Sequence, residues 1–114
     1  MASLAGTAGV VTNSSLSAGT LVVSGSTSTT FLGNLVDGTG STALVKNGFS
    51  TLTLGNITAN NAFAGQNSFT GGVLLNQGQI TVQDPLGLGG ANGSTPGLVT
   101  LNGGTLALNS NGGG

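Results

Sequence analysis

Two segments of this chain match each other position for position, and each consists of two short alternating stretches joined at Asn-x-Gly. The segments are VLLNQGQITV (73–82) and VTLNGGTLAL (99–108). Apolar residues at every second position on both sides of the joint are typical of strands with one buried face. Gly and Asn tolerate the positive φ that a sharp corner requires. We therefore expect each segment to form two strands that meet at a corner, with this corner stacked on that of the next coil.

Two weaker copies of the unit precede these segments. LVKNGFSTLTL (44–54) has its corner at Asn47-Gly48, and SLSAGTLVV (15–23) has Ala18-Gly19 ahead of two alternating apolar residues. Steps of 31, 28 and 26 residues separate the positions that we take as equivalent, which are Leu21, Leu52, Ile80 and Leu106. Repeats of about 20 to 50 residues are the signature of units that stack on one another. We therefore expect an all-β solenoid of about four coils, in which 73–82 lies parallel and in register on 99–108. An antiparallel meander is the alternative, because Asn-Gly also favours hairpins.

The alternation also predicts which side chains form the core. Stacked inward ladders are expected from Leu52, Leu54, Ile80, Val82, Leu106 and Leu108. The residues expected to face outward are Thr51, Thr53, Thr81 and Ala107. All four phenylalanines are expected in the core, with Phe63 and Phe69 as inward anchors; an exposed apolar patch is the alternative.

The composition removes most reactive side chains. The 114 residues include one Lys and two Asp, no His or Cys, and a formal net charge of −1. A chain without a basic cluster lacks the electrostatic footprint of nucleic-acid binding, and no segment approaches the roughly 20 apolar residues of a membrane helix. We expect no nucleic-acid partner and no membrane insertion by this chain. With 37% hydrophobic residues and so little charge, the chain is expected to fold rather than to remain disordered.

The two carboxylates are the first candidates for a catalytic site. Asp37 and Asp84 could act as the paired acids of a glycoside hydrolase. Each instead follows a strand and opens a turn, as Asp-Gly and Asp-Pro, which is a common position for Asp. Two carboxylates are also too few for a calcium site. We therefore expect no catalytic residue, no metal and no cofactor, and a chain that is not an enzyme.

Three further patterns have ordinary structural explanations. Residues 38–43 (GTGSTA) satisfy the glycine pattern of dinucleotide sites, but they precede a strand-like stretch and no acid lies between residues 38 and 83. STSTT (26–30) and TLT (51–53) suggest the threonine ladders of ice-binding solenoids, but this spacing does not recur in the later units. Lys46 is the only cation, and we expect it to be solvated, with pairing to an aspartate as the alternative.

Residues 44–82 resemble the passenger-associated transport repeat of bacterial autotransporters. That repeat runs Leu-x-Lys-x-Gly, Leu-x-Leu, Asn-x-Tyr-x-Gly-Gly, and then a Gly before a pair of alternating apolar residues. The positions that fit are Leu44, Lys46, Gly48, Leu52, Leu54, Asn67, Phe69, Gly71, Gly72, Gly78, Ile80 and Val82. Phe69 stands where the repeat usually has Tyr, and the match is poor before residue 40. The resemblance implies a right-handed parallel β-helix that is extracellular or displayed on a bacterial cell surface, without catalytic residues.

The expected organisation is a single β-solenoid domain over 1–114. It comprises a divergent N-terminal coil (1–36), the best-matching repeat (44–82) and a terminal half-repeat (98–114). Solenoids need polar caps to stay monomeric, yet neither 1–36 nor 98–114 contains a charged residue or a proline to protect its strand edges. We therefore expect a structural stalk or filament subunit whose copies associate end to end. The alternative is an adhesin fragment that contacts a receptor or glycan through loops 57–66 or 83–97.

Overall fold

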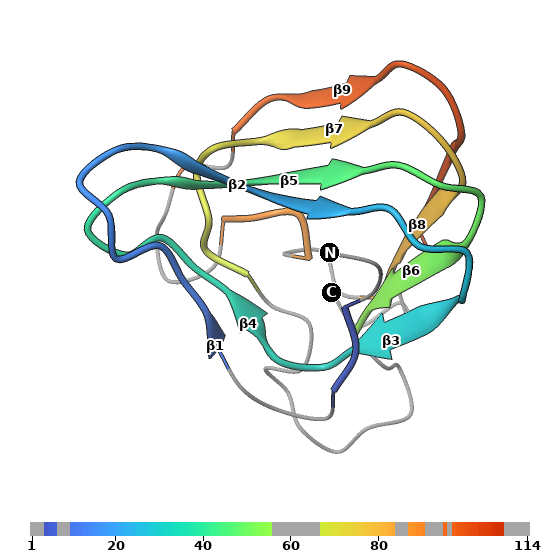
Figure 1. The fold of residues 1–114 in the computed structure, drawn as a ribbon, viewed down its shortest axis with the longest axis horizontal. Helices are drawn as coiled ribbons and strands as arrows, with labels where there is room; N and C mark the ends of the chain where they lie inside the picture. Colours follow the sequence, from blue (N-terminus) through green and yellow to red (C-terminus); the bar gives the residue numbers. More distant parts are fainter. Residues whose placement is uncertain are drawn as a thin grey trace.

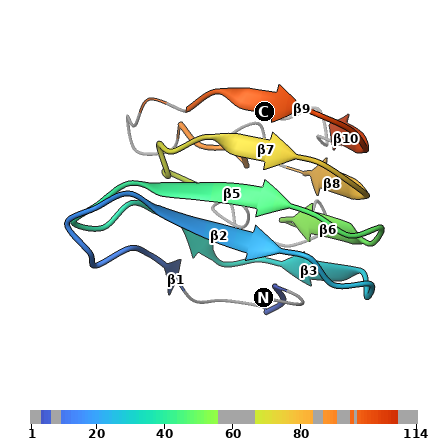
Figure 2. The same ribbon diagram turned by 45° about the horizontal axis from the view of Figure 1, so that its top comes forward.

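The structure is a computed structural model that describes residues 4–6, 10–55, 67–83, 87–90, 95 and 97–108. Its described strands are β1 (Val10–Val11), β2 (Gly19–Val23), β3 (Thr29–Phe31), β4 (Asn34–Leu35), β5 (Thr42–Lys46), β6 (Thr51–Leu54), β7 (Val73–Leu75), β8 (Gln79–Val82), β9 (Val99–Leu101) and β10 (Thr105–Leu108). No helix occurs in these ranges, and so none that could cross a membrane. The strands form a right-handed β-solenoid of about three turns (Figure 2).

Every described strand pair is parallel, which excludes the antiparallel meander for these residues. One four-stranded sheet has the order β2-β5-β7-β9, a second has the order β3-β6-β8-β10, and β1 pairs with β4. Figure 1 shows the two long sheets meeting at an angle, so that each coil runs along one sheet, turns a corner and continues along the other. The predicted register is confirmed, since Val73 pairs with Val99 and Ile80 pairs with Leu106.

The first coil is registered differently from our expectation. Leu21 pairs with Leu44 and not with Leu52, whose partner in the first coil is Thr29. Gly19 begins β2 instead of forming a corner. The steps along this column are 23, 29 and 26 residues, in the order Leu21, Leu44, Val73 and Val99. The assignment failed because both strands of a coil carry the same alternation, so an isolated alternating stretch fits either of them.

The inward positions of the middle coils are filled as expected. The aliphatic residues buried there include Leu52, Leu54, Ile80 and Val82. In the last coil Leu106 is only half-buried and Leu108 is 74% exposed. The expectation for Leu108 is therefore wrong, because no described coil covers the far side of β10.

The residues expected to face outward do so, but one of them, Thr81, is buried. Thr51, Thr53 and Ala107 are half-buried. Thr81 is buried although the alternation places it on the outer face, where its Oγ1 accepts a hydrogen bond of 2.8 Å from Nε2 of Gln79. An outer position in the middle of a sheet can therefore be covered by its neighbours.

The phenylalanines do not all enter the core. Phe69 is fully buried as expected, and Phe31 is buried as well. Phe49 is 84% exposed, which contradicts the expectation. It lies in the corner 47–50, which is one residue longer than the corner 76–78 that stacks on it, so it leaves the strand alternation. Phe63 lies outside the described residues.

The corners stack as the repeat predicted. Gly48, Gly78 and Gly104 have φ values of 76°, 73° and 72°. A Cβ on Gly78 would lie 2.4 Å from the carbonyl oxygen of Gly48, and one on Gly104 would lie 2.5 Å from that of Gly78. A side chain at these positions would therefore separate the coils, in addition to the strain of a positive φ.

An asparagine ladder runs beside the glycines. Nδ2 of Asn76 donates to Oδ1 of Asn47 at 2.8 Å, and Nδ2 of Asn102 donates to Oδ1 of Asn76 at 3.1 Å. The ladder ties three successive corners together.

Candidate functional site

Asp37 holds the backbone of two coils together. Its Oδ1 accepts hydrogen bonds from the backbone N–H of Thr42 at 2.7 Å and of Thr70 at 3.0 Å, and its Oδ2 accepts one from Oγ1 of Thr70. Burial raises the pKa of Asp37, but the hydrogen bonds from Thr70 and Thr42 lower it by more, so the pKa lies below its ordinary value. This carboxylate is ionised, and both of its oxygens accept hydrogen bonds. Asp84, the other carboxylate of the candidate pair, lies outside the described residues.

Lys46 is buried, which contradicts the expectation of a solvated side chain. It is 0% exposed, and its column on the inner face is Val23, Lys46, Leu75 and Leu101. Its Nζ donates hydrogen bonds to the carbonyl oxygens of Asn47 at 2.6 Å and Gly48 at 3.0 Å. The apolar stem therefore packs in the core while the ammonium group binds the carbonyls of the corner.

The environment of Lys46 affects both its charge and its neighbours. Burial lowers the pKa of its ammonium group, because a low-dielectric surrounding disfavours the charged form. A Cβ on Gly78 would lie 3.0 Å from Nζ, so glycine at this position leaves room for the ammonium group. These contacts give Lys46 a structural position at the corner, and both of its described acceptors are backbone oxygens.

Asn67 is a buried polar residue whose role the sequence did not indicate. It is 1% exposed, its Oδ1 accepts from the N–H of Leu35 at 2.7 Å, and its Nδ2 donates to the carbonyl oxygen of Gly87 at 2.5 Å. It thereby bridges a strand of an earlier coil and a turn of a later one. Its place in the Asn-x-Phe motif ahead of two glycines was the available signal.

The remaining candidates are placed as follows. The glycine pattern at 38–43 runs directly into β5 and not into a helix, which confirms the turn interpretation. Loop 57–66 and most of 83–97 lie outside the described residues.

The paired threonine spacing of TLT (51–53) does not recur in the later coils, as the sequence indicated, because Gln79 lies beside Thr51 and Ala107 lies beside Thr81. Thr30, Thr53 and Thr81 form one column of the outer face. The next position of that column is Ala107. This column is not visible as a constant spacing in the sequence, because the coils differ in length.

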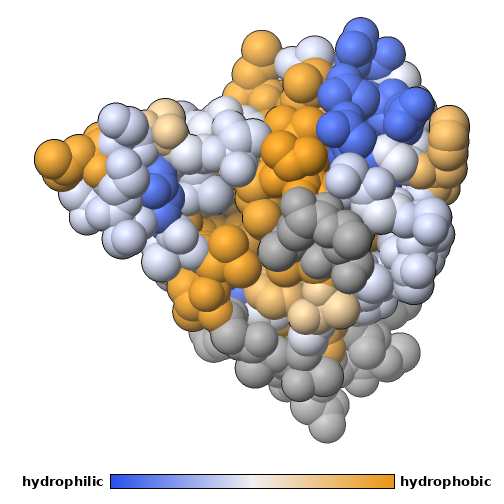
Figure 3. Space-filling model, viewed as in Figure 1, coloured by the Kyte–Doolittle hydropathy of each residue, from blue (hydrophilic) through white to orange (hydrophobic). Residues whose placement is uncertain are grey.

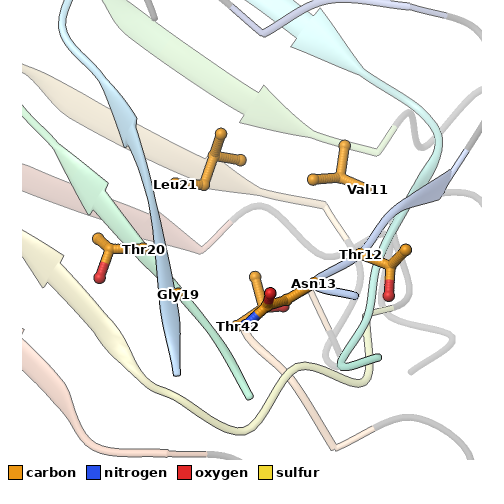
Figure 4. A pocket seen from close by; sticks show the side chains of 7 residues that line it. All are labelled: Val11, Thr12, Asn13, Gly19, Thr20, Leu21 and Thr42. Carbon is orange, nitrogen blue, oxygen red and sulfur yellow. The ribbon is translucent and has the colours of Figure 1, made fainter. Parts of the chain in front are cut away.

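A small hollow lies in the first coil, between the segment after β1 and the start of β2. It measures about 200 Å³ and is lined by Val11, Thr12, Asn13, Gly19, Thr20, Leu21 and Thr42. Figure 4 shows Val11 and Leu21 on one side of it, opposite Asn13 and Thr42. The Nδ2 of Asn13 is already bonded to the carbonyl oxygens of Ser17 and Ser41. Small-molecule pockets usually measure about 300 to 1,000 Å³, so this hollow is small for such a ligand.

The last coil has an uncovered apolar edge. Leu101 is 59% exposed although Leu75, directly beneath it in the column, is 0% exposed. Leu108 differs in the same way from Val82. Figure 3 shows hydrophobic side chains over β9, β7 and β5, and a polar strip along the corners that follow these strands. The candidate functional site is therefore this edge, formed by β9 and β10, and we name it the open edge.

Comparison with known family models, with curated proteins and with solved structures found nothing that matches this chain.

Proposed function

We propose that this chain is a non-catalytic structural protein, an extracellular β-solenoid module that serves as a stalk or self-assembling filament subunit. The observation that carries the proposal is the open edge. Inward columns that are buried in the middle coils continue into Leu101 and Leu108, which are mostly exposed. Burying apolar surface contributes roughly 25 cal/mol per Å², so a further coil placed on this edge would be favourable.

Two other features support a structural role. The carboxylate of Asp37 and the ammonium group of Lys46 are engaged in holding coils and corners together. The extracellular or cell-surface location rests on the resemblance of residues 44–82 to the autotransporter repeat.

The test is association as a function of concentration. We expect light scattering to show a mass that rises with concentration, and electron microscopy to show filaments in concentrated samples. The double variant Leu101→Lys with Leu108→Lys should stay monomeric, because charge on an edge opposes strand addition. Phe49→Lys is the matched control, since Phe49 is also mostly exposed but lies in a corner of a middle coil. A wild-type chain that remains monomeric at every concentration would contradict the proposal.

A binding module is the second candidate. The observation in its favour is the exposed aromatic side chain of Phe49, because aromatic residues are enriched at recognition surfaces. In this alternative the chain is an adhesin fragment that contacts a receptor or glycan, through loops 57–66 or 83–97 together with Phe49. Loss of binding in a glycan array upon Phe49→Ser, with unchanged association, would favour it.

A further inference from the structure

We propose that Asn102 is a site of spontaneous deamidation, at which the uncovered corner of the last coil converts an amide into a carboxylate and so places a negative charge on the open edge. The modification needs only water and the backbone of the chain itself. It goes beyond the proposed function, and only its effect on association rests on that function.

The reaction is open to an asparagine that is followed by glycine. The backbone nitrogen of the glycine gives up its proton to water and attacks Cγ of the asparagine, a C–N bond forms, and the side-chain nitrogen leaves as ammonia. Water then adds to one carbonyl carbon of the resulting succinimide and breaks its bond to that nitrogen. The product is aspartate, or isoaspartate when the chain is left running through the former side chain. Glycine favours ring closure because it has no side chain to obstruct it.

The asparagine ladder contains this dipeptide in two different surroundings. Asn47-Gly48 lies at a middle corner and Asn102-Gly103 at the last one. Asn92-Gly93 and Asn111-Gly112 lie outside the described residues. Because the two described dipeptides are chemically identical, a difference in their reactivity reports what surrounds them.

At the middle corner the attacking nitrogen is held in place. The N–H of Gly48 donates to Oε1 of Gln77 at 3.0 Å. A Cβ on Gly78 would lie 2.4 Å from the carbonyl oxygen of Gly48, so the next corner stacks directly on this residue. The Oδ1 of Asn47 also accepts a hydrogen bond from Asn76 of the next coil. Ring closure at Asn47 therefore requires local opening of two stacked corners.

At the last corner the corresponding groups lack these contacts. Asn102 is exposed, and within the described part of the chain neither its Oδ1 nor the N–H of Gly103 has a hydrogen-bond partner. The contacts that hold Asn102 come from the coil beneath, where its Nδ2 donates to Oδ1 of Asn76 and its N–H to the carbonyl of Leu75. Ring closure at Asn102 breaks one side-chain hydrogen bond and displaces no described coil.

Loss of the amide removes the last rung of the ladder. An ionised carboxylate at position 102 has no hydrogen to donate to Oδ1 of Asn76, and it brings a negative charge close to that oxygen. Isoaspartate would also lengthen the backbone ahead of Gly104, where a Cβ would lie 2.5 Å from the carbonyl oxygen of Gly78. The corner that joins β9 to β10 is therefore loosened by either product.

The new charge matters because the open edge has none. No charged side chain occurs in 97–108, and the formal net charge of the chain is −1, so one added carboxylate doubles it. Charge on an edge strand opposes the addition of another strand. Deamidation would therefore close the open edge to association as the protein ages. A coil stacked on that edge would protect Asn102 as the third coil protects Asn47.

The test is peptide mapping by mass spectrometry of dilute protein incubated at neutral pH, with each Asn-Gly peptide quantified separately over time. Deamidation at Asn102 should be about tenfold faster than at Asn47, which corresponds to about 1.4 kcal/mol of protection at the middle corner. Equal rates, or a faster reaction at Asn47, would overturn the proposal.

Two controls separate the effect of the fold from that of the local sequence. In urea the two rates should converge, because the unfolded chain keeps the dipeptides and loses the coils; a difference that persists there would overturn the structural explanation. Gln77→Ala removes the acceptor of the Gly48 N–H and should speed the reaction at Asn47 alone. An unchanged rate at Asn47 in this variant would contradict the protective role of that bond. Circular dichroism would verify that the variant folds.

The effect on association has a readout of its own. Asn102→Asp reproduces the charged product, and Asn102→Ser removes the same ladder bond without adding charge. By light scattering, Asn102→Asp should associate less than Asn102→Ser, and equal association would overturn the effect of the charge. A wild-type chain that stays monomeric would overturn the proposed function, while faster deamidation at Asn102 than at Asn47 would still support the modification site.

Discussion

The inner columns are buried at the N-terminal end of the solenoid and exposed at its C-terminal end. At the N-terminal end Val23 is 2% exposed, whereas Leu101 at the other end of its column is 59% exposed. Phe31 and Leu108, at the two ends of another column, differ in the same direction, at 4% and 74%. The position in a column therefore does not by itself make a residue part of the core.

The N-terminal end is covered because earlier residues lie against it. Leu4 is buried, its carbonyl accepts a hydrogen bond of 2.6 Å from Oγ1 of Thr29, and Gly6 bridges to Phe31. Nearby, β1 pairs with β4 and brings Val11 against the core. The difference between the ends shows that each coil of a solenoid is stabilised by its neighbours, and that the last one depends on whatever covers it.

The largest effect should come from placing the same charge at two positions of one column. Val82→Asp is expected to prevent folding, because an unpaired carboxylate in a dry core costs several kcal/mol. Leu108→Asp should fold, since that position is mostly solvated. Thermal melts followed by circular dichroism compare them. Equal melting temperatures would show that Val82 and Leu108 do not differ in burial in solution.

Shortening a leucine side chain at two positions of one column should give a smaller difference in stability. Leu75→Ala is expected to lower the free energy of unfolding by about 2–5 kcal/mol, as for other buried leucines. Leu101→Ala, in the next coil of the same column, should change it by less than about 1 kcal/mol. Urea unfolding of dilute samples measures both, and a larger loss for Leu101→Ala would indicate that the open edge is covered in solution.

The column that joins Val23 to Leu101 contains Lys46, which predicts a pH dependence. Its folded-state pKa lies below the ordinary value of 10.5, so above the folded pKa the unfolded chain binds more protons than the folded one. Stability should therefore rise with pH between the lowered pKa and 10.5. The chain has no Tyr, Cys or Arg to obscure this. A rise in melting temperature in this window, absent in Lys46→Met, is expected; an identical rise in the variant would exclude Lys46 as its cause.

The smallest effect is expected from Asp37, which ties neighbouring coils through Thr70. Because its pKa is lowered in the folded state, its contribution is present above the unfolded value near 3.8 and is lost as pH falls through the folded pKa. The wild-type chain should lose stability below about pH 4 more steeply than Asp37→Asn. Parallel acid titrations that coincide for the two proteins would contradict this role.

Much of the fold could be predicted from the repeat. The Asn-x-Gly corners, the parallel register of 73–82 on 99–108 and the inward ladder of the middle coils follow from alternation and glycine geometry. The resemblance to the autotransporter repeat supplied the right-handed solenoid, and Asp37 was correctly placed at a turn. The open edge was expected only in general terms, from the lack of charge and proline near the ends.

The sequence by itself determined the alternation, the corners and the near absence of charge, because these are local properties of the chain. Only the tertiary structure decided what each position contacts. Lys46 is buried because corner carbonyls lie within reach of its ammonium group, and Phe49 is exposed because its corner is one residue longer than the next. The same alternating pattern gives a buried Val82 and an exposed Leu108, because burial depends on whether another coil lies on top, and local sequence does not encode that neighbour.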